Sequence, residues 1–198
     1  MRVTLFDYGA GNLHSLGKAL ETGTTEVRVT SDPLASLATD VLVLPGVGAF
    51  AAAAERLAPA REAMRAAIEG GLPCLGVCLG MQLLFEASAE GPGLGLGVLA
   101  GAVERLEARR VPQIGWNALE PAGDPLFAQS ALADAWFANS YVCRPRDPGV
   151  VTAWSTHEGD RFPAAVRSGR TLGVQFHPEK SSRAGVRFLH AFLAEAAR

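Results

Sequence analysis

The sequence predicts an α/β protein whose central sheet is mostly parallel and flanked by helices, with an added antiparallel strand layer in the C-terminal half. Strand and helix patterns alternate over residues 2–87, which indicates a parallel sheet covered on both faces. Several of these strands are apolar throughout, as expected for strands buried on both sides. Short strands joined by turn signals dominate residues 98–176. We expect residues 1–198 to form a single domain, because a chain of 198 residues suffices to bury one core.

The elements of the first half follow from apolar runs and helical patterns. In chain order, we expect a strand at 2–7, a helix at 12–22, strands at 26–30 and 40–44, an alanine-rich helix at 49–69, a strand at 72–77 and a helix at 79–87. Residues 91–97 carry alternating glycines, but they do not connect a strand to a helix. We therefore interpret them as a glycine-rich loop and not as a dinucleotide-binding motif.

The second half is expected to be rich in strands and to close with a helix. The strands expected here span 98–106, 113–119, 135–143, 150–155, 164–168 and 171–176. The last segment, about 183–197, has apolar residues at helical spacing and predicts an amphipathic helix. Functional groups of parallel sheets gather at the carboxyl ends of the strands. Asp7, Pro45 and Cys78 are therefore expected along one edge of the sheet.

Composition narrows the classes of function. The formal net charge is −2, so the chain lacks the basic field that would hold nucleic acid or an anionic membrane. It has no apolar run of about 18 residues and no signal-peptide pattern, which favours a cytoplasmic protein. Its three cysteines include no C-x-x-C pair, and we expect neither a disulfide framework nor a zinc site. No metal and no cofactor is expected.

Cys78 is the strongest candidate for a reactive residue. It follows a buried strand, precedes a helix, and lies between Gly76 and Gly80 in a G-x-C-x-G frame. This frame is the cysteine version of a nucleophile elbow, in which small neighbours let the chain reverse sharply. The start of a helix also favours a thiolate. The alternative is an ordinary buried cysteine, which is our interpretation of Cys74 and Cys143.

A reactive thiolate needs a proton carrier, and His177 is the best of the four histidines. His177 follows a strand directly, and Pro178 forms a rigid step to Glu179. The Glu179 carboxylate can therefore turn back and hold the imidazole in one tautomer. His14, His157 and His190 are expected to be bystanders. Leu79 would supply one backbone N–H to an oxyanion hole.

The loop at residues 45–48, Pro-Gly-Val-Gly, is expected to supply the second oxyanion donor, from Val47 or Gly48. Its two glycines allow peptide orientations that other residues cannot adopt, so the loop could switch a donor in and out. The alternative is a plain turn between a strand and a helix.

Taken together, three segments resemble the class I glutamine amidotransferase family. They are the Pro-Gly-Val-Gly loop, the segment Gly-Val-Cys-Leu-Gly-Met-Gln at 76–82, and Gln-Phe-His-Pro-Glu at 175–179. The resemblance implies a flavodoxin-like core and a reaction in which Cys78 attacks the side-chain amide of glutamine. A glutamyl thioester forms, ammonia leaves, His177 carries the proton and Glu179 orients His177.

The same resemblance implies residues that hold the glutamine substrate: Gly48, Gln82, Asn139, Ser140 and Tyr141. Asn139 stands where similar sequences usually have histidine, and a backbone contact would survive that difference.

Three further segments, 7–13, 112–117 and 179–181, resemble one branch of this family, whose members serve histidine biosynthesis. In that branch the glutaminase passes ammonia to a separate cyclase subunit with a (β/α)8 barrel. The resemblance therefore implies a heterodimer, and the candidates for its interface are Asn12, Trp116, Asn117 and Lys180.

Other functions stay open at this point. A free-standing cysteine hydrolase would turn over substrate without a partner, and a non-catalytic binding module would use Cys78 only for packing. Within the amidotransferases, the main competitor is the glutaminase subunit of pyridoxal phosphate synthase, which also has a barrel partner. Segments 7–13 and 112–117 argue against that competitor.

Overall fold

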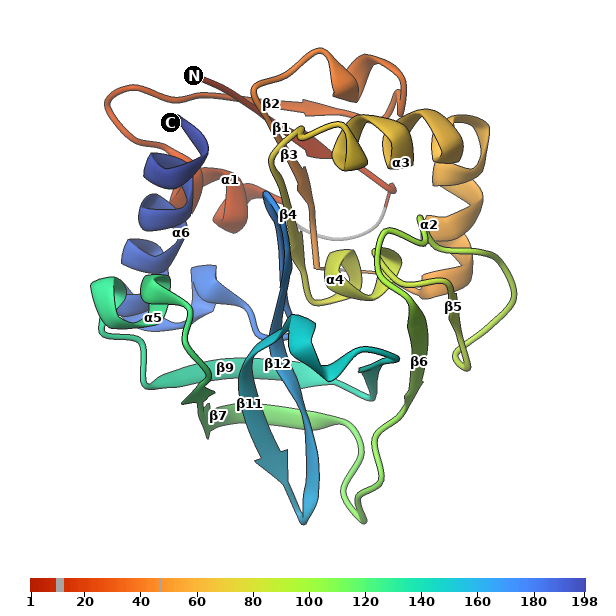
Figure 1. Ribbon diagram of the computed structural model, residues 1–198, viewed down its shortest axis with the longest axis vertical. Coiled ribbons are helices and arrows are strands. Elements are labelled where there is room, and N and C mark those ends of the chain that lie inside the picture. The colour runs from red at the N-terminus through yellow and green to blue at the C-terminus, as the bar shows by residue number, and fades with distance from the viewer. Residues whose placement is uncertain (10–12, 47) are drawn as a thin grey trace.

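A computed structural model of the chain describes residues 1–9, 13–46 and 48–198. Within these residues the main sheet has eight strands in the order β2-β1-β3-β4-β13-β12-β11-β8 (Figure 1). Their bounds are β1 Arg2–Phe6, β2 Glu26–Thr30, β3 Val41–Leu44, β4 Cys74–Val77, β8 Glu120–Pro121, β11 Val151–His157, β12 Asp160–Ser168 and β13 Thr171–Val174.

The main sheet is parallel in one half and antiparallel in the other. Strands β2, β1, β3, β4 and β13 pair in parallel, whereas β12, β11 and β8 continue the same sheet antiparallel. The predicted fold class is confirmed. The added strands do not form one separate layer, however. They extend the main sheet, and two small sheets flank it: β10 (Tyr141–Pro145) with β6 (Gly101–Arg105) and β5 (Ala87–Ser88), and β7 (Gln113–Ala118) with β9 (Asp134–Asn139).

Helices cover both faces of the parallel half. On one face lie α1 (His14–Leu20), α5 (Pro125–Ser130) and α6 (Ser182–Ala196); on the other lie α2 (Phe50–Leu57), α3 (Arg61–Glu69) and α4 (Leu79–Leu83). Short 3₁₀ turns span Ala35–Leu37, Ala58–Ala60, Pro148–Val150 and Pro178–Lys180.

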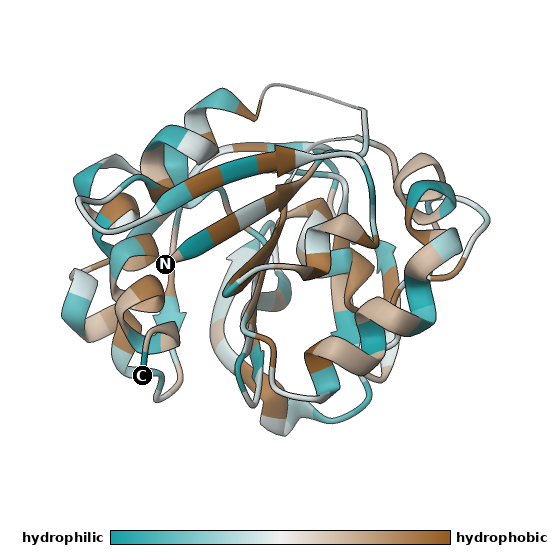
Figure 2. Ribbon diagram, turned by 90° about the horizontal axis from the view of Figure 1, so that it is seen from above, coloured by the Kyte–Doolittle hydropathy of each residue, from teal (hydrophilic) through white to brown (hydrophobic). Residues whose placement is uncertain are grey.

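The strands separate the core into two clusters because successive side chains point to opposite faces. In β3, Val41 and Val43 pack with α1 and α6, whereas Leu42 and Leu44 pack with α2 and α4. All four side chains are fully buried. Figure 2 shows these hydrophobic strands between helices that carry hydrophilic residues. The sheet is therefore anchored on both sides, and its carboxyl edge is a rigid support for a site.

Several details differ from the sequence expectation, among them the following three. The predicted helix 49–69 is interrupted at Ala58–Ala60, because Pro59 lacks an N–H and disfavours a continuous helix. The predicted strand 135–143 is two strands, β9 and β10, in different sheets. Helix α5 was not predicted; Asp124 caps it by accepting a hydrogen bond of 2.9 Å from the backbone N–H of Leu126.

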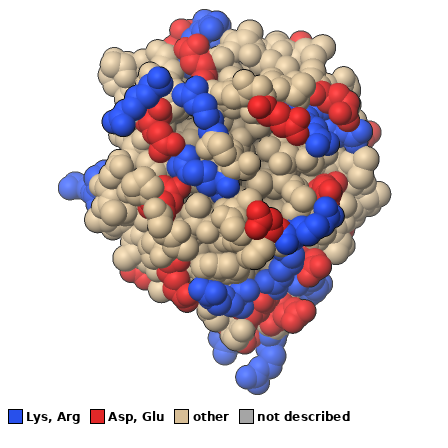
Figure 3. All heavy atoms as spheres, viewed as in Figure 1, with Lys and Arg blue, Asp and Glu red and all other residues tan. Residues whose placement is uncertain are grey.

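On the face drawn in Figure 3, basic and acidic side chains are interspersed, in keeping with the formal net charge of −2. Among the described helices, none is both long enough and apolar enough to span a bilayer.

Candidate active site

Cys78 lies on a sharp bend between β4 and α4. Its backbone has φ 46° and ψ −102°, a conformation that residues other than glycine rarely adopt. The neighbouring glycines are required by space. A Cβ on Gly80 would collide with the backbone oxygen of Leu44, and a Cβ on Gly76 would lie 2.7 Å from the Gly80 carbonyl. The G-x-C-x-G frame therefore exists because β3, β4 and α4 approach one another too closely for side chains.

His177 and Glu179 lie on the turn that follows β13. The Nδ1 atom of His177 is 2.9 Å from Oε1 of Glu179, and the two side chains are only 4% and 7% exposed. Pro178 starts a short 3₁₀ turn between them, which brings the carboxylate back onto the ring. The other carboxylate oxygen, Oε2, is buried without a hydrogen-bond partner among the described residues.

Ser181 ties this turn to a distant strand. Its hydroxyl donates to the His177 backbone oxygen at 2.7 Å and accepts from the Trp136 backbone N–H at 2.9 Å. In addition, the His177 backbone N–H donates to the Trp136 oxygen at 2.8 Å. The backbone of His177 is thus held on both sides by β9, so the direction of its imidazole ring depends on that strand.

The bend at Cys78 and the turn that carries His177 meet at Gly46. A Cβ built on Gly46 would lie 3.0 Å from both the Cβ of Cys78 and the Cε1 of His177, so these two atoms are at most twice that distance apart. Burial of His177 opposes its charge, but hydrogen bonding and charge interactions with Cys78 and Glu179 outweigh that effect and raise the pKa of His177 to about 10. At neutral pH the ring is therefore an imidazolium beside the sulfur of Cys78.

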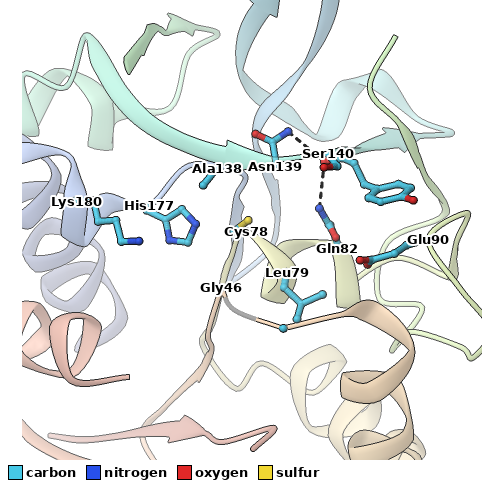
Figure 4. Close-up of a pocket in the computed structure, with 12 residues that line it drawn as sticks. Gly46, Cys78, Leu79, Gln82, Glu90, Ala138, Asn139, Ser140, His177 and Lys180 are labelled. Atoms are coloured by element: carbon cyan, nitrogen blue, oxygen red, sulfur yellow. Dashed lines mark hydrogen bonds between the residues drawn. The ribbon is translucent and has the colours of Figure 1, made fainter. Parts of the chain in front are cut away.

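A cavity of about 350 Å³ opens in front of this pair (Figure 4). Its lining comes from the carboxyl edge of the main sheet and from the segment that joins β9 to β10. The lining residues are Gly46, Gly48, Cys78, Leu79, Gln82, Glu90, Ala138, Asn139, Ser140, Tyr141, His177 and Lys180. The structure thus brings most of the residues expected to act together to one place. Val47, expected in the oxyanion hole, lies outside the described residues.

The side chains of Gln82 and Asn139 both use the backbone oxygen of Tyr141. Gln82 Nε2 and Asn139 Nδ2 each donate to this oxygen at 3.2 Å. The Asn139 side chain points away from Cys78 in Figure 4, and its Oδ1 is buried without a partner in the described part of the chain. Its side chain therefore braces the strand end, and what it presents to the cavity is backbone.

The sequence patterns did not point to two further residues of the site, Glu90 and Gln175. Glu90 lines the cavity, and its carboxylate accepts a 2.9 Å hydrogen bond from the backbone N–H of Phe50 at the start of α2. It precedes a stretch that reads as a plain glycine loop, so no motif marked it. Gln175 is fully buried, and its Nε2 lies 3.4 Å from Sγ of Cys78. The available sequence signal for Gln175 was its position in the motif at 175–179, two residues before His177.

The candidate interface residues have different environments. Trp116 is 53% exposed and packs edge-to-face against Trp136, with ring centroids 6.1 Å apart. Lys180 is exposed at the cavity and has no ion pair with a described residue. Asn117 instead uses its side chain within the protein, donating to the Thr156 oxygen at 2.9 Å. Asn12 lies outside the described residues.

The surroundings of the remaining cysteines and of two of the other histidines favour a structural role for these residues. Burial raises the pKa of Cys74 to about 12 and raises that of Cys143 as well, so neither thiol is ionised at neutral pH. The rings of His157 and His190 each contact one backbone oxygen at 3.0 Å, those of Arg110 and Ala19.

Comparison with known proteins agrees with this geometry. The family model for "Glutamine amidotransferase class-I" matches residues 4–196. The "Imidazole glycerol phosphate synthase subunit HisH" of Thermus thermophilus is 45% identical over 196 residues, covering 96% of this chain and 95% of the relative. The HisH subunit of Symbiobacterium thermophilum is 46% identical over 194 residues, covering 95% and 91%.

Among solved structures, a "glutamine amidotransferase" superposes with a TM-score of 0.77 at 25% identity and 99% coverage of both chains. The "PurLQS" structure from Thermotoga maritima shares the fold, with a TM-score of 0.75 at 21% identity and 98% coverage of both chains. The chain belongs to the class I glutamine amidotransferase family.

Proposed function

We propose that the chain is the glutaminase subunit of imidazole glycerol phosphate synthase, which hydrolyses L-glutamine and passes the ammonia to a cyclase subunit. The names of relatives at 45–46% identity support this assignment. The observation that carries it is the placement of His177 between Cys78 and Glu179 at the wall of a cavity. A cytoplasmic location is part of the proposal and is supported by the biosynthetic names of the relatives.

The first half of the reaction forms a thioester. The Cys78 thiolate attacks the side-chain carbonyl carbon of glutamine, and the carbonyl electron pair moves to oxygen. The backbone N–H of Leu79 and a donor from the 45–48 loop, at Val47 or Gly48, stabilise this oxyanion. When the intermediate collapses, the imidazolium of His177 gives its proton to the amide nitrogen, the C–N bond breaks and ammonia leaves. Glu179 holds the ring in the required orientation throughout.

The second half regenerates the enzyme. The now neutral His177 takes a proton from water, and the resulting hydroxide attacks the thioester carbonyl. The C–S bond then breaks, its electron pair returns to sulfur, and glutamate leaves. His177 keeps the proton, so the thiolate and imidazolium pair is restored.

The charges around the cavity suit a free amino acid. Glu90 offers a carboxylate to the α-ammonium group of glutamine, a role that the sequence alone did not assign. Gly48, Gln82 and the backbone of Asn139, Ser140 and Tyr141 provide the remaining polar contacts in the proposal.

The partner is a cyclase with a (β/α)8 barrel, and together the two subunits form a heterodimer. The cyclase uses the ammonia to convert PRFAR into imidazole glycerol phosphate and AICAR. The exposed side chains of Trp116 and Lys180 provide the docking face, since exposed aromatic side chains are enriched at protein interfaces. Asn12 belongs to the proposed face as well. Asn117 contributes by holding β7 against β11.

The experiment measures glutamate release by the chain alone and with the cyclase subunit carrying its ligand. We expect weak activity alone and strong activation by the liganded partner, because the 45–48 loop can control the oxyanion donor. Cys78→Ala should lower the rate at least about 10⁴-fold, while Cys74→Ala, a matched control on the preceding strand β4, should retain activity. Unchanged hydrolysis in Cys78→Ala would refute the assignment, and equal rates with and without the liganded partner would refute the switching loop.

A further inference from the structure

The side chain of Gln175 touches the sulfur that performs the proposed reaction. Its Nε2 atom lies 3.4 Å from Sγ of Cys78, and the residue is fully buried. Backbone hydrogen bonds hold the contact in place: the Cys78 N–H donates to the Val174 oxygen at 2.7 Å, and the Gln175 N–H donates to the Ala164 oxygen at 2.9 Å. The amide is thus pressed against the sulfur by the same sheet that positions the bend.

Neighbouring groups determine which end of the Gln175 amide faces the sulfur. The backbone oxygen of Tyr141 can only accept, so the Gln82 atom that lies 3.2 Å from it is the amide nitrogen. That same nitrogen lies 3.4 Å from Oε1 of Gln175. The oxygen end of Gln175 is therefore engaged with Gln82, and its NH₂ end donates to the sulfur.

The amide chain formed by the side chains of Gln82 and Gln175 has a chemical consequence. A donor that points at sulfur from a buried position favours the thiolate, because the thiolate accepts a charge-assisted hydrogen bond that a neutral thiol accepts only weakly. His177 is the other group that favours the thiolate, and it changes its protonation during the reaction. The Gln175 amide cannot titrate, so its support is present in every step.

We propose that Gln175 is a further catalytic residue, whose amide N–H stabilises the sulfur of Cys78 as a thiolate. The proposal rests on the proposed glutaminase reaction for its second part, the breakdown of the thioester. There the C–S bond breaks and its electron pair goes to sulfur, where the Gln175 N–H receives the developing charge. Since Gln82 also lines the cavity, the amide chain links the substrate pocket to the sulfur.

The test measures the rate of Cys78 alkylation by iodoacetamide as a function of pH, in wild type, Gln175→Leu and Gln175→Glu. Mass spectrometry confirms the modified site; Cys74 and Cys143 are buried thiols with raised pKa values and should stay unmodified at neutral pH. Gln175→Leu removes the donor. Gln175→Glu keeps the shape and places an acceptor against the sulfur, which covers the case in which the leucine variant fails to fold.

We expect the alkylation rate at pH 7 to fall about tenfold in Gln175→Leu and further in Gln175→Glu, with the midpoint of the pH dependence moved upward by about one unit. Gln113→Leu is the matched control, because Gln113 is also a buried glutamine and does not contact the sulfur in the structure. Its profile should equal that of wild type. A wild-type profile in folded Gln175→Glu overturns the proposal.

The alkylation assay needs no glutamine, so it separates this inference from the proposed function. A wild-type chain without glutaminase activity in the assembled complex would refute the function and leave the alkylation result standing. Where glutaminase activity is present, kcat of Gln175→Leu should fall about tenfold.

Discussion

The nucleophile bend, residues 76–80, and the base turn, residues 177–181, follow neighbouring parallel strands but are held by different means. Close approach of backbones shapes the bend: the neighbouring backbone leaves no room for a side chain at Gly76 or Gly80, and Cys78 itself has a positive φ. Hydrogen bonds to a distant strand shape the turn, through the hydroxyl of Ser181 and the peptide of Trp136. The bend should therefore be sensitive to added atoms, and the turn to lost hydrogen bonds.

The largest expected effect tests the bend. In Gly80→Ala the new methyl group meets the backbone oxygen of Leu44, which belongs to β3 and cannot move without disturbing the sheet. We expect the free energy of unfolding to fall by about 3 kcal/mol, the upper end of the range for overpacked cores. Urea denaturation measures this change.

Gly23→Ala is the control for that substitution. Gly23 has no positive φ, and a Cβ there meets nothing within 4 Å. We expect its free energy of unfolding to stay within about 0.5 kcal/mol of wild type. If Gly80→Ala were as stable as Gly23→Ala, close backbone approach would not be what holds the bend.

A smaller effect tests the base turn. Ser181→Ala leaves the Trp136 N–H without its acceptor, at a cost of about 2 kcal/mol in the free energy of unfolding. Because the backbone of His177 loses one of its two attachments to β9, kcat for glutamine hydrolysis should fall about tenfold with KM unchanged. Ser181→Thr, which keeps the hydroxyl, should restore most of the rate.

Ser130→Ala separates stability from positioning. Ser130 is as fully buried as Ser181, and its hydroxyl donates to the Leu126 oxygen at 2.7 Å, remote from the cavity. It should lose stability without loss of kcat. Equal kcat values for Ser181→Ala and Ser130→Ala would contradict a positioning role for Ser181.

The smallest expected effect concerns the positive charge of His177 on the base turn. The pKa of His177 is raised from 6.5 to about 10 in the folded protein, so folding favours the protonated ring. This contribution to stability is complete below pH 6.5 and is lost as the pH rises through about 10. Glu179→Gln weakens one cause of the raised pKa in the folded protein, so the loss should be complete about one pH unit lower than in wild type.

Urea midpoints between pH 6 and about pH 10 measure this difference, within the window in which His177 titrates. The conservative variant Glu179→Asp keeps the charge and serves as the control. Identical pH profiles for wild type and Glu179→Gln would show that Glu179 does not stabilise the imidazolium.

The sequence predicted the parts of the fold that depend on short-range patterns. Strands β1, β3 and β4 lie where apolar runs placed them, because a strand buried on both faces needs such a run. The break between β9 and β10 at Ser140 was not predicted, because strand formers flank it at a short distance: Trp136 and Phe137 before it, Tyr141 and Val142 after it. The short helix α5 was hidden in a segment rich in proline and glycine, where its cap, Asp124, also pairs with Arg167 of β12 at 2.6 Å.

The candidate site likewise combines local features of the chain with contacts between distant residues. Cys78 and its glycines, and the step from His177 through Pro178 to Glu179, are local features, because covalent geometry limits where neighbours along the chain can lie. They could therefore be predicted from the amino-acid sequence by itself. Only tertiary structure decided that Glu90 lines the cavity, that Ser181 bonds β9, that Asn117 bonds the Thr156 oxygen of β11 and that Gln175 touches the sulfur. Those contacts join residues tens of positions apart, and the packing of whole strands and helices determines them.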